Sequence, residues 1–247
     1  GVDVVFGTHL ASGAPLGTYL VKSGYTMAAA DAFKIKIQGK GGHGSSPHET
    51  IDAIAIGAQI INQLQYIVSR RVNPQHSAVV SVGSFHAGNA SNVIADSAVL
   101  TGTIRSFDKD VRVQIEEEFR SMVSGICSAF HAEYEIEYNN GYPALFNHDR
   151  ETEVFRDTVK NTLDESMLVD MTPIMGAEDF SYYLQEKPGM FFHTGARNEE
   201  IGASYPHHHP KFDFDEKAMI YAGKAILSIV HQYTVENVEQ VLEEPAY

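Results

Sequence analysis

The sequence predicts an α/β protein in which a β-α-β-β-α-β module, residues 31–145, is inserted into a second α/β domain formed by residues 1–30 and 146–247. The 247 residues suit one large or two medium domains at roughly 100–200 residues per domain. Hydrophobic periodicity alternates between strand and helix across the module, and the flanking segments also mix both patterns. With 43% apolar and 20% charged residues, the chain is typical of a folded globular protein.

The first half of the module contains a strand, a turn and a helix. Alternation over Ala32–Gln38 places Phe33, Ile35 and Ile37 on one face of the strand. The Gly- and Ser-rich stretch 39–47 has the composition of a turn. A helix is expected from about Thr50 to Arg71, with an apolar stripe at Ile51, Ile54, Ala58, Ile61, Leu64 and Val68.

The second half of the module is expected to hold strands over 78–85, 97–107 and 132–138, with a helix before the last strand. Asp108 is placed to cap that helix, whose predicted stripe is Ile115, Phe119, Met122, Ile126 and Phe130. The resulting order is the split-βαβ, or ferredoxin-like, arrangement, an antiparallel sheet with both helices on one face. Because a free sheet edge invites pairing with another chain, we expect this module to serve as a lid and as a dimerisation surface.

The flanking segments predict the second α/β domain. Short strands are expected in residues 1–30, and Val2–Phe6 reads as a buried strand ending at Gly7. Helices are expected at about 151–165, 177–186 and 215–233, with a strand at 189–194. Because a loop or cap usually precedes a core strand, we expect the chain to be a fragment.

Charge and cysteine content exclude several classes of protein. The 18 Lys plus Arg against 32 Asp plus Glu give a net charge of −14, which argues against nucleic acid or an anionic membrane as partner. A single cysteine, Cys127, rules out an internal disulfide and suits a reducing compartment, so we expect a cytoplasmic protein. No stretch approaches the roughly 18 consecutive apolar residues that a membrane span needs.

Two histidines stand in contexts that suit chemistry. His9 follows the first expected strand, and ligands gather at the carboxyl ends of strands in open α/β sheets. His43 is surrounded by glycines, which let the backbone approach another surface and leave the imidazole free to donate a hydrogen bond to a developing oxyanion. A structural histidine and a flexible hairpin are the respective alternatives. Since no G-x-S-x-G motif surrounds Ser45 or Ser46, a serine nucleophile elbow is excluded.

Two further clusters combine polar and charged residues. Arg105 lies in an otherwise apolar strand, where its planar guanidinium suits a substrate carboxylate or, alternatively, an internal ion pair. Asn92, in the preceding 88–92 segment, is either a binding residue or an ordinary turn residue. Glu178 stands where a helix dipole would favour an acid, and the triple histidine 207–209 resembles a metal site or a solvated loop.

In this order and spacing, the clusters resemble peptidase family M20, the aminoacylase and carboxypeptidase family of two-metal peptidases. The resemblance is to its amidohydrolase branch, which includes N-acyl-amino-acid amidohydrolases, hippurate hydrolases and plant auxin-conjugate hydrolases. It covers essentially the whole chain. The motifs that carry it are Gly-Lys-Gly-Gly-His-Gly-Ser-Ser-Pro-His (39–48), Asn-Val-Ile (92–94), Gly-Ala-Glu-Asp-Phe (176–180) and His-His-Pro-Lys-Phe-Asp (208–213).

The resemblance implies a role for each candidate residue. His9 and His208 match metal ligands of the family, with His209 at the variable position of its His-x-Pro motif. His43 matches a lid histidine that approaches the reacting carbonyl, often from the partner subunit of a dimer. The remaining matches are to substrate-binding positions: Asn92 and Arg105 for the carboxylate end, and Glu178 in the loop that lines the pocket.

The resemblance also implies a fold and a reaction. The fold would be an α/β metallohydrolase catalytic domain, incomplete here, with the inserted lid. Two divalent metal ions (zinc, manganese, cobalt or nickel) would support hydrolysis of a small N-acyl amino acid to a carboxylate and a free amino acid. The protein would form a homodimer through the lid.

The chain departs from the family in one respect. The family carries a His-x-Cys-Gly-His-Asp motif and a Pro-Ala-Glu-Glu motif, which supply most metal ligands and the general base, and neither occurs in this sequence. Because a catalytic zinc needs about three protein ligands, we expect the isolated chain to be inactive. The alternatives are a dipeptidase or carboxypeptidase of the same family, or a non-catalytic dimerising fragment.

Overall fold

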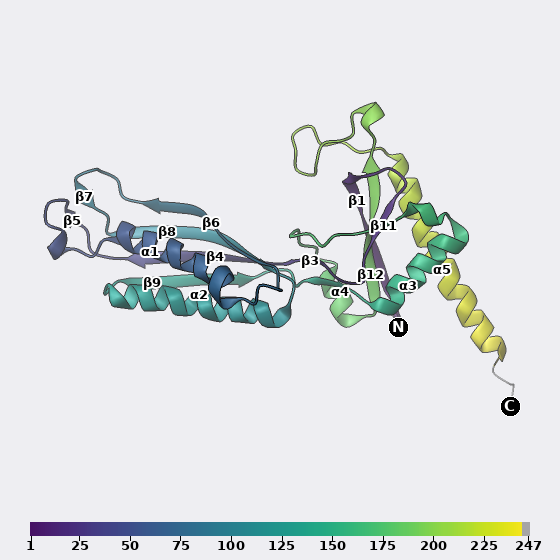
Figure 1. Cartoon of the computed structure of the whole chain (residues 1–247), viewed down its shortest axis with the longest axis horizontal. Coiled ribbons are helices and arrows are strands. Elements are labelled where there is room, and N and C mark those ends of the chain that lie inside the picture. Colours follow the sequence, from purple (N-terminus) through teal and green to yellow (C-terminus); the bar gives the residue numbers. More distant parts are fainter. Residues whose placement is uncertain (244–247) are drawn as a thin grey trace. The chain divides into compact units, whose positions relative to one another are not determined.

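The computed structural model describes residues 1–243, with side chains placed through Thr234. The chain forms two compact units (Figure 1). Unit 1 comprises Gly1–Thr26, Phe146–Pro173 and the chain from Phe180 onward, and unit 2 comprises Met27–Leu145 and Ile174–Asp179. Both units mix helices and strands, which confirms the α/β class.

Unit 2 is built on a four-stranded antiparallel sheet. Its strands are β4 (Ala29–Gln38), β6 (Ala78–Ala87), β8 (Ser97–Ser106) and β9 (Glu133–Asn140), in the order β6-β8-β4-β9. Helix α1 (Ala53–Tyr66) follows β4, and α2 (Lys109–Ala129) follows β8, so the elements run β-α-β-β-α-β along the chain. Two short strands, β5 (Gly42–His43) and β7 (Val93–Ile94), pair with each other outside this sheet.

The two faces of this sheet differ in chemistry. Phe33, Ile35 and Ile37 of β4 are buried against both helices, as the alternation predicted. On the opposite face, Lys34 and Lys36 form ion pairs with Glu135 and Glu137 of β9, at N–O distances of 2.8–3.6 Å. Both helices therefore cover one face, and the other is polar.

The predicted apolar stripe of α1 is correct only in part. The helix begins later than expected, at Ala53, because Ile51 still pairs with Lys40 in extended conformation and the Asp52 carboxylate accepts from the Ile54 and Ala55 amides. Ile54 is 42% exposed. Leu64 of the predicted stripe is fully buried, and Ile51, Ile61 and Val68 pack partly against the core. The other fully buried positions lie on the neighbouring face: Ala53, Ile56, Gly57 and Ile60.

Helix α2 follows its prediction more closely. The Asp108 carboxylate accepts from the Asp110 and Val111 amides at 2.8 and 3.0 Å, which confirms the predicted cap. Ile115 and Phe119 are fully buried, whereas Phe130 lies beyond the last turn and is half exposed.

Unit 1 holds a mixed sheet of order β1-β12-β2-β11, formed by β1 (Val5–Pro15), β2 (Tyr19–Val21), β11 (Leu168–Asp170) and β12 (Gly189–Arg197). Strand β1 runs parallel to β12, and β2 runs antiparallel to β12. The helices are α3 (Asp149–Thr162), α4 (Ser181–Glu186) and α5 (Lys217–Glu243). The core consists of Tyr19, Val21, Phe155, Val159, Met190, Phe192, Ala225 and Ile229. A small sheet of β3 (Gly24–Met27) and β10 (Leu145–Asn147) lies where the chain passes between the units.

Strand β1 does not end at Gly7, as the sequence predicted. It continues through this residue because Gly7 has no side chain where the rings of Phe180 and Phe191 approach: an added Cβ would lie 2.8 Å from each. The glycine is thus a packing position within the strand.

No helix in the described part of the chain has the length and apolar character needed to cross a membrane.

A buried ion pair joins three elements of unit 2. Asp31 of β4 accepts from the Arg112 guanidinium of α2 through both carboxylate oxygens, from the Gly141 amide at 3.1 Å, and from the Tyr138 hydroxyl at 3.4 Å. The Asp31 side chain is only 1% exposed. Burial and the neighbouring Asp31 carboxylate raise the pKa of Tyr138, so the hydroxyl stays a proton donor.

We expect Asp31→Asn to destabilise the protein by about 3 kcal/mol, because the Arg112 charge loses its buried partner. Asp157→Asn is the matched control, since Asp157 faces Lys160 at 3.9 Å with its side chain 66% exposed and should cost less than about 0.5 kcal/mol. Urea denaturation of both variants measures the difference. Equal losses would show that the Asp31 network contributes no more than a surface pair.

Candidate functional site

His9 lies in the middle of β1, and not at the carboxyl end of a strand as predicted. In the parallel pairing of β1 with β12, His9 stands opposite His193. The Thr8 and Thr194 hydroxyls form a hydrogen bond of 2.9 Å beside this pair. Because paired residues of adjacent strands point to the same face, the register brings the two imidazoles together.

The backbone fixes the tautomer of the His9 ring. Its Nδ1 lies 2.7 Å from the Leu10 carbonyl oxygen. A carbonyl only accepts, so Nδ1 carries a proton, and in the neutral ring Nε2 keeps its lone pair. Metal-binding histidines commonly have this arrangement, with one ring nitrogen held by a backbone carbonyl and the other turned to the ion. His9 is exposed and therefore accessible for such a role.

His193 is a member of the cluster that the sequence did not reveal. Its ring centroid lies 6.2 Å from that of His9, and its Nδ1 is buried without a hydrogen-bond partner among the described residues. Burial, followed by the nearby His9 and His207, lowers the pKa of His193 to about 4. The only sequence signal is a histidine within an apolar strand, because strand register cannot be read from one sequence.

The triple histidine divides into three different environments. His207 packs edge-on against His9 with ring centroids 5.1 Å apart. The Nε2 atom of His207 accepts a hydrogen bond from the Ser12 amide at 3.3 Å. Burial is the first cause of a lowered pKa for His207, and His9 the second. His209 stacks on Tyr205 at 4.5 Å.

His208 is the exception within the triple histidine. Its backbone is left-handed, with φ of 67°, a conformation that is uncommon for residues other than glycine. The side chain is exposed, and neither ring nitrogen is hydrogen-bonded within the described residues. Local strain of this kind occurs often at ligand sites.

These histidines do not form a metal centre by themselves. In the described part of the chain, no three ligand-type side chains stand close enough to hold an ion. His9 has the hydrogen bonding of a ligand and His208 has a free ring, but a catalytic zinc needs about three protein ligands. The donor set therefore fits a metal site only in part.

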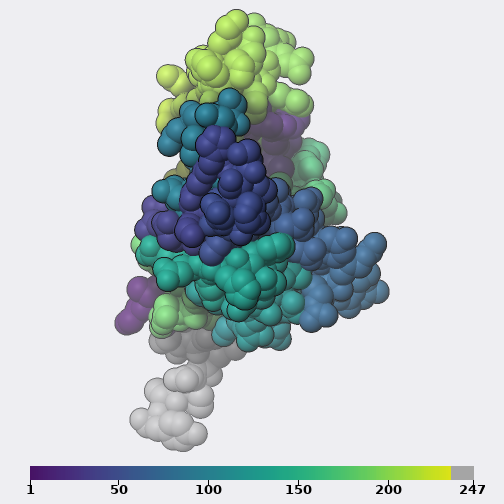
Figure 2. Space-filling view, turned by 90° about the vertical axis from the view of Figure 1, so that its left-hand side faces the viewer, coloured from purple at the N-terminus to yellow at the C-terminus, as the bar shows by residue number. Residues whose placement is uncertain are grey.

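In unit 2, the glycines around His43 serve close backbone approach, as the sequence predicted. An added Cβ would lie 2.9 Å from the Ile94 carbonyl oxygen at Gly41 and 3.0 Å from that of Asn92 at Gly44. The pairing of β5 with β7 and the bond from the Gly44 amide to the Asn92 carbonyl, 2.8 Å, hold the segment in place. His43 is exposed. Figure 2 shows a dark blue segment, from the first fifth of the chain, at the end that faces the viewer.

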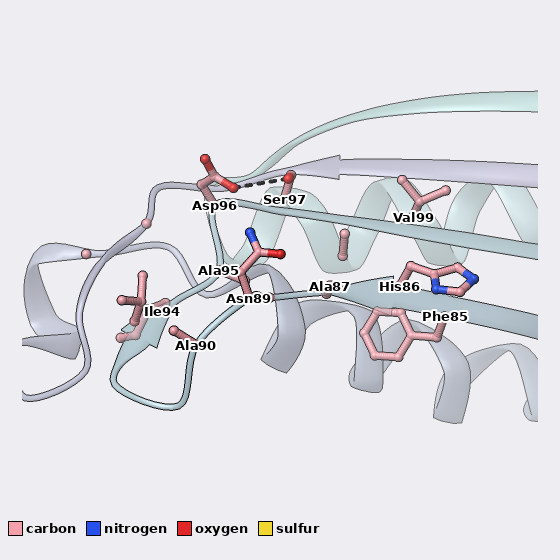
Figure 3. A pocket seen from close by; sticks show the side chains of 15 residues that line it. Phe85, His86, Ala87, Asn89, Ala90, Ile94, Ala95, Asp96, Ser97 and Val99 are labelled. Atoms are coloured by element: carbon pink, nitrogen blue, oxygen red, sulfur yellow. Dashed lines mark hydrogen bonds between the residues drawn. The ribbon is translucent and has the colours of Figure 1, made fainter.

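A groove of about 870 Å³ adjoins this segment. Figure 3 shows Asn89, Asp96 and His86 around it, with Asp96 accepting from the Ser97 hydroxyl at 3.1 Å. Gly41 and Gly42, next to His43, also line the groove. Asn92 does not line it, and its backbone carbonyl is occupied by Gly44.

Arg105 forms no ion pair among the residues that the structure describes, which removes the alternative of an internal pair. Its Nε donates to the Met175 carbonyl at 3.2 Å, and its Nη1 donates to the Thr103 hydroxyl and to the Ile104 carbonyl. The guanidinium is half-buried, and no carboxylate of the described residues compensates its charge. It therefore suits an external anion.

Glu178 lies in the 174–179 segment, which belongs to unit 2. The Ala28 amide donates to the Ile174 and Gly176 carbonyls, and Arg105 donates to Met175, so the segment is held at three backbone positions. Helix α4 begins only at Ser181, and its first turn contains no acid. The predicted helix at 177–186 therefore started too early, and a helix dipole does not explain Glu178.

Within one chain, Arg105 and the His43 segment lie far apart. Arg105 pairs with Ala30 near one end of β8, whereas Ser97 at the other end pairs with Gln38. Eight residues of extended strand span about 27 Å at roughly 3.4 Å per residue. The structure thus does not bring Asn92 or His43 together with Arg105.

Comparison with known proteins identifies relatives along nearly the whole chain. The Bacillus subtilis protein YhaA is 54% identical over 94% of this chain and 58% of its own length. Thermostable carboxypeptidase 2 of Saccharolobus solfataricus is 43% identical, over 89% of this chain and 55% of its own. N-acetyl-L-cysteine deacetylase of B. subtilis is 36% identical, over 99% of this chain and 57% of its own. The chain therefore spans less than two thirds of the length of these relatives.

A solved structure and a family model agree with these matches. The B. subtilis YxeP protein, described as a dinuclear metal-binding peptidase of the M20 family, superposes with a TM-score of 0.76 at 31% identity, over 95% of this chain and 58% of that one. The model of peptidase family M20/M25/M40 matches residues 1–232. The chain belongs to peptidase family M20/M25/M40.

Proposed function

We propose that this chain is part of a metal-dependent amidohydrolase of the aminoacylase type, which hydrolyses N-acyl amino acids to a carboxylate and a free amino acid. The His9 ring carries the proposal, because the Leu10 carbonyl holds the proton on Nδ1 and leaves Nε2 as a metal-binding lone pair. A relative that matches 99% of the chain is named as a deacetylase of N-acetyl-L-cysteine.

His9 and His208 would each contribute an imidazole to a site for two divalent ions, zinc, manganese, cobalt or nickel. Bound metal supplies an activated water and polarises the acyl carbonyl. The dinuclear description of YxeP supports this number of ions. The remaining ligands would come from protein segments outside this chain.

The other candidate residues would act on the substrate. His43, exposed and backed by a rigid glycine-rich segment, would donate a hydrogen bond to the tetrahedral oxyanion. Arg105, a half-buried guanidinium without an ion pair in the described structure, would bind the amino-acid carboxylate. Asn92 and Glu178 would line the substrate site, and unit 2 would form the ferredoxin-like lid.

One observation favours a second candidate function within the family. Thermostable carboxypeptidase 2 is 43% identical to the chain, more than the N-acetyl-L-cysteine deacetylase at 36%. A carboxypeptidase also binds a free carboxylate next to the scissile amide, so Arg105 would serve either reaction. Only the group on the acyl side distinguishes the two.

The incomplete donor set predicts that the 247-residue chain alone does not hydrolyse amides. Fusion to the part of YhaA outside the match should yield a divalent-metal-dependent enzyme that releases amino acids from N-acetyl amino acids. His9→Ala and His208→Ala should each lower the bound metal of the fusion, measured by elemental analysis after dialysis. Normal hydrolysis by the chain alone would contradict the proposal, and activity only on dipeptides would favour the carboxypeptidase.

In the same fusion, Arg105→Met should lower kcat/KM for N-acyl amino acids about 10- to 150-fold, the loss expected for a charged hydrogen bond of about 1.5–3 kcal/mol. The matched substrates are the same N-acyl amino acids as carboxamides. If Arg105→Met acts by removing carboxylate binding, the enzyme loses only its preference for the acid over the carboxamide. If the substitution acts by loosening the 174–179 segment, hydrolysis of both substrates slows equally. A wild-type fusion without any preference for the acid would refute the carboxylate role.

We further propose that the chain forms a homodimer through β6 of unit 2. The two edges of the sheet differ: β9 carries Glu133, Glu135 and Glu137, whereas β6 contains no Lys, Arg, Asp or Glu. Charged edges resist pairing with another chain and uncharged edges permit it. The groove in Figure 3 adjoins this edge through Phe85 and His86.

A dimer through β6 predicts that Ser81→Lys converts the protein to a monomer in light scattering. In a two-fold interface the substitution occurs twice, so each copy places an ammonium group in the interface. Asn139→Lys on β9 is the matched control and should leave the dimer intact. A monomeric wild-type chain, or dissociation by the control alone, would exclude β6 as the interface.

A further inference from the structure

Both hydrogen-bond donors of Ser45, the backbone amide and the hydroxyl, contact the His43 ring. The Ser45 amide lies 3.1 Å and the Ser45 hydroxyl 2.8 Å from His43 Nδ1. An amide only donates, so Nδ1 must present a lone pair. Because Nδ1 is then an acceptor, the hydroxyl donates to it as well.

The neutral ring consequently carries its proton on Nε2. The segment that holds this geometry is fixed on both sides of the histidine: His43 pairs with Val93, the Gly44 amide donates to the Asn92 carbonyl, and the Ser46 amide donates to the His43 carbonyl, both at 2.8 Å. An Nε2–H group cannot accept a proton at that atom. His43 can therefore donate a hydrogen bond through Nε2 but cannot act there as a base.

We propose that Ser45 is a positioning residue that holds His43 in the neutral Nε2–H form, as a hydrogen-bond donor. This deepens the proposed function, in which His43 stabilises an oxyanion, and rests on it for the catalytic use of the donor. A group aimed at developing negative charge is effective when its donor is already oriented. The same reasoning gives His9 the opposite form, since the Leu10 carbonyl holds the proton on Nδ1.

The ring tautomer can be read from the nitrogen chemical shifts of the ¹⁵N-histidine-labelled chain at a pH where the rings are neutral. Wild-type His43 should show one form, with Nδ1 unprotonated and Nε2 protonated. His48 is the internal control: it lies in the same segment and is exposed, with Glu49 3.9 Å from its Nε2. It should show a mixture of both forms.

Two variants and one control separate the donors. Ser45→Ala removes the hydroxyl donor, so part of the His43 population should shift to the Nδ1–H tautomer. Ser45→Pro removes the amide donor as well, and His43 should then show the same mixture of tautomers as His48. Ser46→Ala should leave His43 unchanged, because the Ser46 amide contacts the His43 carbonyl and not the ring. A wild-type His43 that is protonated on Nδ1, or mixed like His48, would overturn the inference. Since the measurement needs neither metal nor substrate, its outcome is independent of whether the fusion hydrolyses amides.

Discussion

The parallel pairing of β1 with β12 is the constraint on which the histidine cluster of unit 1 depends. It sets His9 opposite His193 and fixes the Thr8–Thr194 hydrogen bond beside them. The pairing requires glycine on β12, because a Cβ at Gly189 or Gly195 would lie about 2 Å from a backbone carbonyl oxygen. A one-residue shift in register would turn His193 to the opposite face.

Backbone groups one or two residues further along the chain give the exposed histidines different tautomers. The Leu10 carbonyl leaves His9 a lone pair at Nε2, and the Ser45 amide leaves His43 a proton at Nε2. The Lys211 amide, 3.0 Å from His209 Nδ1, gives His209 the same form as His43. An imidazole that keeps a proton on Nε2 is a poor metal ligand at that atom. This supports His208, with no bond to its ring in the described residues, as the ligand of the triple histidine.

Local patterns predicted the elements better than they predicted the packing. The alternation in β4 and the Asp108 cap depend on neighbouring residues, and both were correct. The stripe of α1 was correct at Leu64 but wrong at Ile54, because this helix is apolar on two faces and tertiary packing chose Ile56 over Ile54. His193 was missed for a related reason, since its role depends on the register of a strand about 180 residues away along the chain.

The separation along β8 bears on how a complete site would be assembled. A small N-acyl amino acid spans far less than the roughly 27 Å of strand between Ser97 and Arg105, so Arg105 and His43 of one chain cannot both bind it through unit 2 alone. If both residues act on one substrate, they come from two copies of the chain. The uncharged edge of β6 would bring such copies together. In the fusion with the remaining part of YhaA, a variant that dissociates the dimer would then abolish hydrolysis without altering any residue that touches the substrate.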